Sequence, residues 1–172
     1  MLRQMEFDAD SYETKVAGSA AFAQTKTKLQ TLVVASQWAH GKMEESWQNR
    51  RLPENLPGFI NLSIKNLTPE LRKKVVETAT QKKTGIFDTH PCDADRIRSA
   101  AAMNQPGVIH LTEPASNLFS GFADLSKAAT RFHYESNFEL RITEHNLMSH
   151  EVAARESQTQ AEGESALHDY FF

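Results

Sequence analysis

Apolar side chains recur at intervals of three and four residues over most of the chain, which is the period of an amphipathic α-helix. The pattern predicts a first helix over residues 1–18 and a long second helix that begins at Ser19 and ends before Pro53. A third helix is signalled by Thr68-Pro69-Glu70, because threonine caps a helix, proline fits its first turn and an acid there complements the helix dipole.

The second half of the chain alternates helical stretches with breaks. Asp93 is predicted to cap a helix, and another helix is predicted to follow Pro114. In that last stretch the apolar residues are dense and should be buried against the earlier helices; they include Leu118, Phe119, Phe122, Leu125, Ala128, Ala129 and Phe132. Residues 148–164 carry little apolar surface, which leaves a weakly packed helix and partial disorder both open.

Three short stretches interrupt this helical pattern. Asn55-Leu56-Pro57-Gly58 is predicted to be a loop, and residues 59–64 fit a short helix as well as a strand. Residues 108–111 are short and favour a β segment. We therefore predict an all-α fold, a bundle of about five to seven helices with at most short β segments.

Composition excludes several classes of partner and site, but it does not indicate a particular function. The chain has 172 residues and a net charge of -3, with acidic and basic residues mixed along it. That charge pattern offers no basic stripe, so nucleic acid is not expected as a partner. The single cysteine, Cys92, excludes an internal disulfide framework and a cysteine-rich zinc module. No apolar run approaches the length of a membrane span, so the chain as given is expected to be soluble.

Glu6 and Asp10 are the first residues that suggest chemistry. They lie four positions apart on the predicted first helix, so both carboxylates should share one face. Such a pair is suited to a metal ligand and its supporting carboxylate, although one carboxylate alone does not hold zinc. The same spacing is also common on solvated helix faces.

The zinc-protease signature His-Glu-x-x-His is absent from the sequence. The only His-Glu dipeptide, His150-Glu151, is not followed by the second histidine, and we interpret it as a chance match. The other histidines, among them His40 and His133, share no spacing typical of a ligand set and are interpreted as structural or surface residues.

Two segments nevertheless resemble a known family. The segment that starts at Glu6-Phe7-Asp8-Ala9-Asp10 resembles the Glu-x-x-x-Asp helix of the HtpX and CAAX-prenyl-protease family of membrane-associated zinc metallopeptidases. Downstream, Thr89-His90-Pro91 is similar to that family's His-Pro motif, and the Arg96-Ile97 pair lies on the helix that follows. The two motifs also occur in the family's order.

The resemblance implies a role for each matched residue. Glu6 would be the third zinc ligand, Asp10 a carboxylate that orients a ligating histidine, and His90 a contact of the substrate or the developing oxyanion. The implied cofactor is zinc in the complete protein, with none expected in this chain alone. The implied partners are a peptide or protein substrate and the upstream half of the protease domain.

The resemblance also implies a domain organisation. Residues 1–103 would be the C-terminal half of a zinc-metallopeptidase-like domain, and residues 104–172 a helical extension whose last part is flexible. The complete protein would be membrane-associated, with this part in the cytoplasm and inactive alone. Helical sequence begins directly at Met1. The chain is therefore either a piece of a longer protein or a protein that starts naturally at this methionine.

The alternative is a helical interaction or regulatory module without catalysis, whose exposed apolar stripe docks a partner helix or a second copy of the chain. Self-association is expected under both interpretations, because a missing half-domain would also leave apolar surface uncovered.

Overall fold

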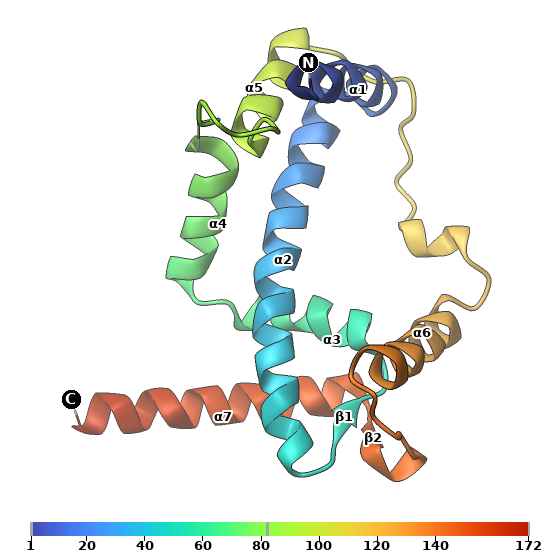
Figure 1. The fold of residues 1–172 in the computed structure, drawn as a ribbon, viewed down its shortest axis with the longest axis vertical. Helices are drawn as coiled ribbons and strands as arrows, with labels where there is room; N and C mark the ends of the chain where they lie inside the picture. The colour runs from blue at the N-terminus through green and yellow to red at the C-terminus, as the bar shows by residue number, and fades with distance from the viewer. Residues whose placement is uncertain (1, 82, 172) are drawn as a thin grey trace. The chain divides into compact units, whose positions relative to one another are not determined.

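The structure, a computed structural model, describes residues 2–81 and 83–171. Within these residues it contains seven α-helices, three short 3₁₀-helices and one pair of two-residue strands (Figure 1). The predicted all-α fold with short β segments is confirmed. The chain forms two compact units: unit 1 holds the described residues up to Val34 together with Thr68–Glu113, and unit 2 holds Ala35–Leu67 together with the described residues from Pro114 onward.

Unit 1 is built from α1 (Leu2–Ala17), the first part of α2 (Ser19–Gln48), α4 (Pro69–Gln81) and α5 (Asp93–Met103). Helix α5 packs against both α1 and α4. The predicted start of α4 is confirmed, since the Thr68 hydroxyl accepts a hydrogen bond from the backbone N–H of Leu71 at 3.3 Å. Within this helix Val75 is buried, whereas the neighbouring Val76 is half exposed.

The end of α1 lies directly against the chain that follows α5. Gly18 and Gly107 both adopt positive φ, at +96° and +81°, and a Cβ on Gly18 would lie 2.7 Å from the carbonyl oxygen of Pro106. The backbone N–H groups of Val108 and Ile109 donate to the carbonyl of Val16, an otherwise unpaired group at a helix end. The two glycines therefore allow the close backbone approach that closes unit 1.

The β segment predicted at residues 108–111 is wrong. These residues have no regular secondary structure, and the backbone N–H groups of Val108 and Ile109 bond to the end of α1 rather than to a strand partner. A β-prone sequence forms a strand only where another strand is available for pairing.

Unit 2 is built from the last part of α2, α3 (Leu56–Ser63), α6 (Phe122–Asn137) and α7 (His150–Phe171). Two short strands, β1 (Leu52–Pro53) and β2 (Leu147–Met148), pair in parallel. Helix α3 lies at the centre of the unit, with contacts to α6 and α7. The buried core of the unit consists of Ala39, Met43, Leu52, Leu56, Phe59, Tyr134, Ile142, Met148 and Ala153.

The predicted loop at Asn55–Gly58 is wrong, because α3 begins there. Asn55 is the N-cap residue, and its side-chain oxygen accepts a hydrogen bond from the backbone N–H of Gly58 at 3.0 Å. Pro57 lies in the first turn, where its missing N–H costs no helical hydrogen bond. The residues typical of a turn are here the residues of a helix start, and residues 59–63 continue the helix.

The burial predicted for the apolar residues after Pro114 is also wrong. Leu118, Phe119 and Phe132 are exposed by 81%, 51% and 70% of their surface. The buried residues of α6 are instead Ser126, Thr130 and Tyr134, which follow one another at intervals of four. Hydrogen bonds explain this choice of face: Thr130 accepts from the N–H of Leu56 at 2.8 Å, and the Tyr134 hydroxyl donates to the carbonyl of Pro53 at 2.9 Å.

The acidic segment near the C-terminus forms part of α7. Its sequence is compatible with a weakly packed helix and with partial disorder. In the structure residues 150–164 are helical. Ala153 and Ser157 are buried, at intervals of four along the face that meets the rest of unit 2. Within the residues that the structure describes, no helix has the length and apolar character that crossing a membrane requires.

Candidate functional site

Helix α1 turns one polar face toward the interior of unit 1. Asp10 and Thr14, four positions apart, are 4% and 0% exposed, and the Glu6 side chain on the same face is 28% exposed. A carboxylate is rarely buried unless a cation is paired with it. The burial of Asp10 therefore depends on a partner from elsewhere in the chain.

That partner is Arg96, in the second turn of α5. Its Nε and Nη2 donate to the two carboxylate oxygens of Asp10 at 2.7 and 2.6 Å, which is the bidentate geometry of a guanidinium on a carboxylate. Its Nη1 also lies 3.1 Å from Glu6 Oε2. The hydrogen bond to Asp10 raises the pKa of Arg96, and the charge of Glu6 acts in the same direction. Arg96 thus fixes α1 against α5 at the candidate site.

His90 reaches the same place from the connection between α4 and α5. Its Nδ1 lies 2.8 Å from Glu6 Oε1, and about two thirds of its side chain is open to solvent. Pro91 follows it directly, which restricts the backbone of His90 to an extended conformation. One carboxylate, Glu6, therefore contacts both an exposed imidazole and a half-buried guanidinium.

The connection that carries His90 is held at two points. Near the N-terminus of α1, Arg3 donates to the backbone carbonyls of Gly85, Ile86 and Asp88 at 2.7 to 2.9 Å. Arg3 is thus one turn before Glu6 on the face of α1 that meets this segment. A guanidinium that binds several carbonyls orders a loop that lacks regular hydrogen bonds.

The second point is at the start of α5. Asp95 accepts a hydrogen bond from the backbone N–H of Thr84 at 2.9 Å and another from the Thr84 hydroxyl. These bonds lower the pKa of Asp95 to about 2, the side-chain bond being the larger cause. The prediction that Asp93 caps α5 is wrong by one position, since Cys92 is the N-cap residue and Asp93 begins the helix.

The structure therefore brings together the three residues named from the sequence, Glu6, Asp10 and His90. Arg96 is the residue whose role the sequence analysis missed, although it lies in the segment that carries the resemblance. The sequence carried only part of the signal: Arg96 follows His90-Pro91 on the next helix, but the burial of Asp10, which requires a cation, is known only from the fold.

Metal-ligating side chains are sparse at this site. Among the residues that the structure describes, no three histidine, cysteine, aspartate or glutamate side chains form a group that could hold a metal ion. His150, of the incomplete His-Glu match, is the first residue of α7 in unit 2. The arrangement in unit 1 offers one carboxylate, Glu6, to an external cation, with Asp10 already occupied by Arg96.

Comparisons with protein-family models, with curated proteins and with solved structures gave no match for this chain.

Proposed function

We propose that this chain supplies the carboxylate-bearing helix and the His-Pro segment of a zinc metalloendopeptidase similar to the HtpX and CAAX-prenyl-protease family. The observation that carries the proposal is the meeting of Glu6 with His90 and Arg96, which lie 84 and 90 positions away along the chain. The sequence resemblance pairs these two segments, and the fold gives them a physical reason to occur together.

The charges around Glu6 are compatible with a metal ligand. Arg96 balances one of the two carboxylates, so Glu6, Asp10 and Arg96 together carry one net negative charge. A carboxylate has about four lone-pair positions, and Glu6 uses two of them, one toward His90 and one toward Arg96. The carboxylate is also partly exposed, which leaves it open to a cation. Glu6 thus fits one position of a zinc site, and two further ligands must come from other residues.

Each of the remaining residues has a distinct task under this proposal. Bound zinc would supply a Lewis acid and an activated water. Glu6 would hold the metal, while Asp10 and Arg96 would fix the position of α1 and so of Glu6. When His90 donates its Nδ1–H to Glu6, its Nε2 can donate to a substrate oxygen only in the imidazolium form.

The complete protein would be a membrane-associated peptidase that acts on a peptide or protein. Its upstream half would supply the two histidines and the general base as His-Glu-x-x-His. The first test is therefore the reading frame before Met1: the proposal requires it to encode this motif. A reading frame that lacks the motif contradicts the proposal.

The second test is the zinc content of the complete protein. Glu6→Gln keeps the size of the side chain but removes the ligand charge. Losing a residue that only orients a metal ligand lowers metal affinity by about 10- to 100-fold, and losing a ligand itself should cost at least as much. We expect the purified variant to lose zinc, measured by atomic absorption, and to lose peptide cleavage. Glu13→Gln is the matched control, because Glu13 is an exposed carboxylate on the same helix. Equal zinc content in all three proteins would rule out Glu6 as a ligand.

The chain alone gives a further check. A single carboxylate should bind zinc no better than about millimolar, since structural and catalytic sites need three or four ligands. Calorimetry with zinc should therefore detect no tight binding. Micromolar one-to-one binding that Glu6→Gln abolishes would show that this chain holds a complete zinc site. It would contradict a site whose other ligands come from the upstream half of the domain.

A helical interaction module is the second candidate, favoured by exposed apolar residues on α1. Leu2, Met5 and Tyr12 are 55%, 60% and 69% exposed, where a partner helix or a second copy could pack. Sedimentation velocity over a range of concentrations should show self-association that Met5→Glu reduces. If the complete protein contains no His-Glu-x-x-His motif and self-associates in this way, the module is the better description.

A further inference from the structure

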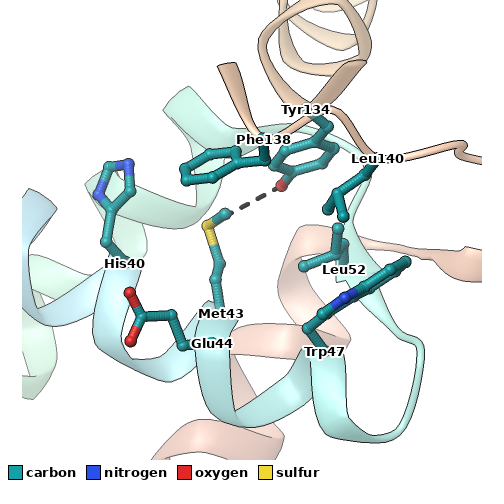
Figure 2. Close-up of a pocket in the computed structure, with 8 residues that line it drawn as sticks. All are labelled: His40, Met43, Glu44, Trp47, Leu52, Tyr134, Phe138 and Leu140. Carbon is teal, nitrogen blue, oxygen red and sulfur yellow. Dashed lines mark hydrogen bonds between the residues drawn. The ribbon is translucent and has the colours of Figure 1, made fainter. Parts of the chain in front are cut away.

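A cavity of about 220 Å³ opens in unit 2, where the end of α2 meets the end of α6. Its lining is mostly apolar and comes from both helices, from β1 and from the segment after α6 (Figure 2). The lining residues are His40, Met43, Glu44, Trp47, Leu52, Tyr134, Phe138 and Leu140. None of them belongs to the Glu6 site in unit 1.

The one fully buried polar group of the lining, the hydroxyl of Tyr134, is already hydrogen-bonded. It donates to the carbonyl of Pro53 at 2.9 Å. Burial raises the pKa of Tyr134, so the phenol stays neutral. Met43, Leu52 and Leu140 complete the walls with apolar atoms. The part of a ligand that enters must therefore be apolar, since a polar group would lose its hydration without replacement.

The size of the cavity is suited to one ring. A cavity of about 150 Å³ lined by apolar side chains holds benzene. The volume here, about 220 Å³, leaves room for a phenyl ring and a short carbon arm. Trp47 and Phe138 present aromatic surfaces on which such a ring can pack in tilted or edge-to-face contact.

Two polar side chains of the lining, Glu44 and His40, present acceptors. Figure 2 shows His40 and Glu44 together at one side of the cavity, and Trp47, Leu52 and Leu140 at the other. Glu44 is exposed and has no hydrogen bond or ion pair to another described residue. His40 Nδ1 lies 2.7 Å from the carbonyl oxygen of Ser36, so Nδ1 carries the proton of the neutral ring and Nε2 is an acceptor.

The cations near these acceptors are engaged with other groups. Lys42 pairs with Glu45 at 2.8 Å, and the guanidinium of Arg50 lies over the ring of Trp47, 4.9 Å from its centre. Among the described residues, Glu44 is therefore a carboxylate with no ion-pair partner beside an apolar cavity. This combination favours a ligand that carries an apolar ring and a positive charge.

We propose that the cavity binds a small aromatic amine, in which a ring that fills the cavity carries an ammonium group on a short arm that reaches Glu44 and His40.

The test uses the two tryptophans of the full chain, whose indole N–H groups give separate signals in a ¹H–¹⁵N correlation spectrum. Trp47 lines the cavity, whereas Trp38 packs on Phe59 in the core, with ring centres 6.4 Å apart, and serves as an internal reference. Titration with 2-phenylethylammonium should shift the Trp47 signal to saturation, with a Kd of about a millimolar for so small a ligand. The Trp38 signal should stay in place.

Three ligands of similar size, one cationic, one neutral and one anionic, separate the contribution of charge to binding from that of burying the ring. We expect 2-phenylethylammonium to bind more tightly than 2-phenylethanol, and 3-phenylpropionate to bind least. Glu44→Gln should weaken the ammonium ligand about three-fold and leave the alcohol unchanged, as for an exposed ion pair. Glu45→Gln is the matched control, since it removes a neighbouring charge that is paired with Lys42.

Each contrary result overturns the proposal. A Trp47 signal that does not saturate, or a Trp38 signal that shifts equally, means that the ligand does not occupy the cavity. Equal binding of the ammonium and carboxylate ligands, or unchanged ammonium binding in Glu44→Gln, means that Glu44 does not select a cation. Glu44 is exposed, so its substitution should leave the fold intact.

Discussion

Helices α1 and α6 have the same length, 16 residues, and each buries a polar face while apolar side chains stay exposed. In α1 the buried residue Asp10 is charged, and its partner Arg96 comes from a segment 86 positions away. In α6 the buried hydroxyl of Thr130 donates to the carbonyl of Ser126 in the same helix and accepts from Leu56. The charge of Asp10 thus needs a distant cation, whereas the hydroxyl of Thr130 is partly satisfied by its own helix.

The comparison explains why the two helices serve different purposes. The polar face of α1 leaves one carboxylate, Glu6, with spare lone pairs at the edge of the buried pair, which is the basis of the proposed metal ligand. The polar face of α6 has its hydrogen bonds within the protein and holds the first turn of α3 and the strand residue Pro53. It is therefore part of the packing of unit 2.

The largest loss of stability is expected when the cation of the buried Asp10–Arg96 pair is removed. Arg96→Met leaves Asp10 buried without a counter-charge, which costs about 3 kcal/mol of unfolding free energy. Urea denaturation would measure the loss. The double variant Arg96→Met with Asp10→Leu should recover much of it, because two apolar residues then replace the pair. Arg98→Met is the control, since Arg98 is about half exposed and should change stability little. An equal loss in both single variants would contradict the role of Arg96.

An intermediate loss of stability is expected from substitutions on the buried face of α6. Thr130→Val keeps the shape of the side chain but leaves the N–H of Leu56 without its acceptor, at a cost of about 1–2 kcal/mol. Leu125→Gln, on the exposed face, should change the unfolding free energy by only about 0.5 kcal/mol or less. Thermal or urea unfolding would rank the two variants. A larger loss for Leu125→Gln would mean that the apolar face of α6 is the buried one.

The smallest effect is expected in the segment that leads from His90 into α5. The pKa of Asp95 is lowered from 3.8 to about 2 in the folded chain, so its carboxylate stabilises the fold above about pH 4 and loses that contribution as the pH falls toward 2. Asp95→Asn should therefore be less stable than the parent chain at pH 5, and the gap should narrow by pH 2.5. Urea midpoints at both pH values would show this. A gap that stays constant would mean that the charged form is not the one stabilised.

The sequence predicted the helices well where local chemistry is decisive. The cap at Thr68 and the helical period over α1 and α2 are local signals, and the structure confirms the cap and both helices, although the apolar residues of α1 are exposed. Asn55-Leu56-Pro57-Gly58 was predicted as a loop because the same residue types serve turns and helix starts. Only the packing of α3 between α6 and α7 decides between the two.

The candidate site was predictable in part. The resemblance named Glu6, Asp10 and His90, and the structure brings them together, but their roles in binding zinc and substrate remain predictions. Arg96 was missed because the helical period shows only that Glu6 and Asp10 share a face of α1. It shows neither that this face is buried nor what it meets. His40 and His133, which share no sequence spacing, have ring centres 6.1 Å apart on neighbouring helices of unit 2. Such contacts across elements have no local signal.

By itself the sequence determined that this protein is helical, where most of its helices begin and which carboxylates share a face of α1, because caps and periodicity act over a few residues. Only the tertiary structure decided which face each helix buries. Asp10 and Thr130 are inside because a guanidinium and a backbone N–H from other segments meet them there, while the more apolar residues of α6 find no such neighbour among the described residues. Burial follows from the partner that the fold supplies, and that partner lies far away in the sequence.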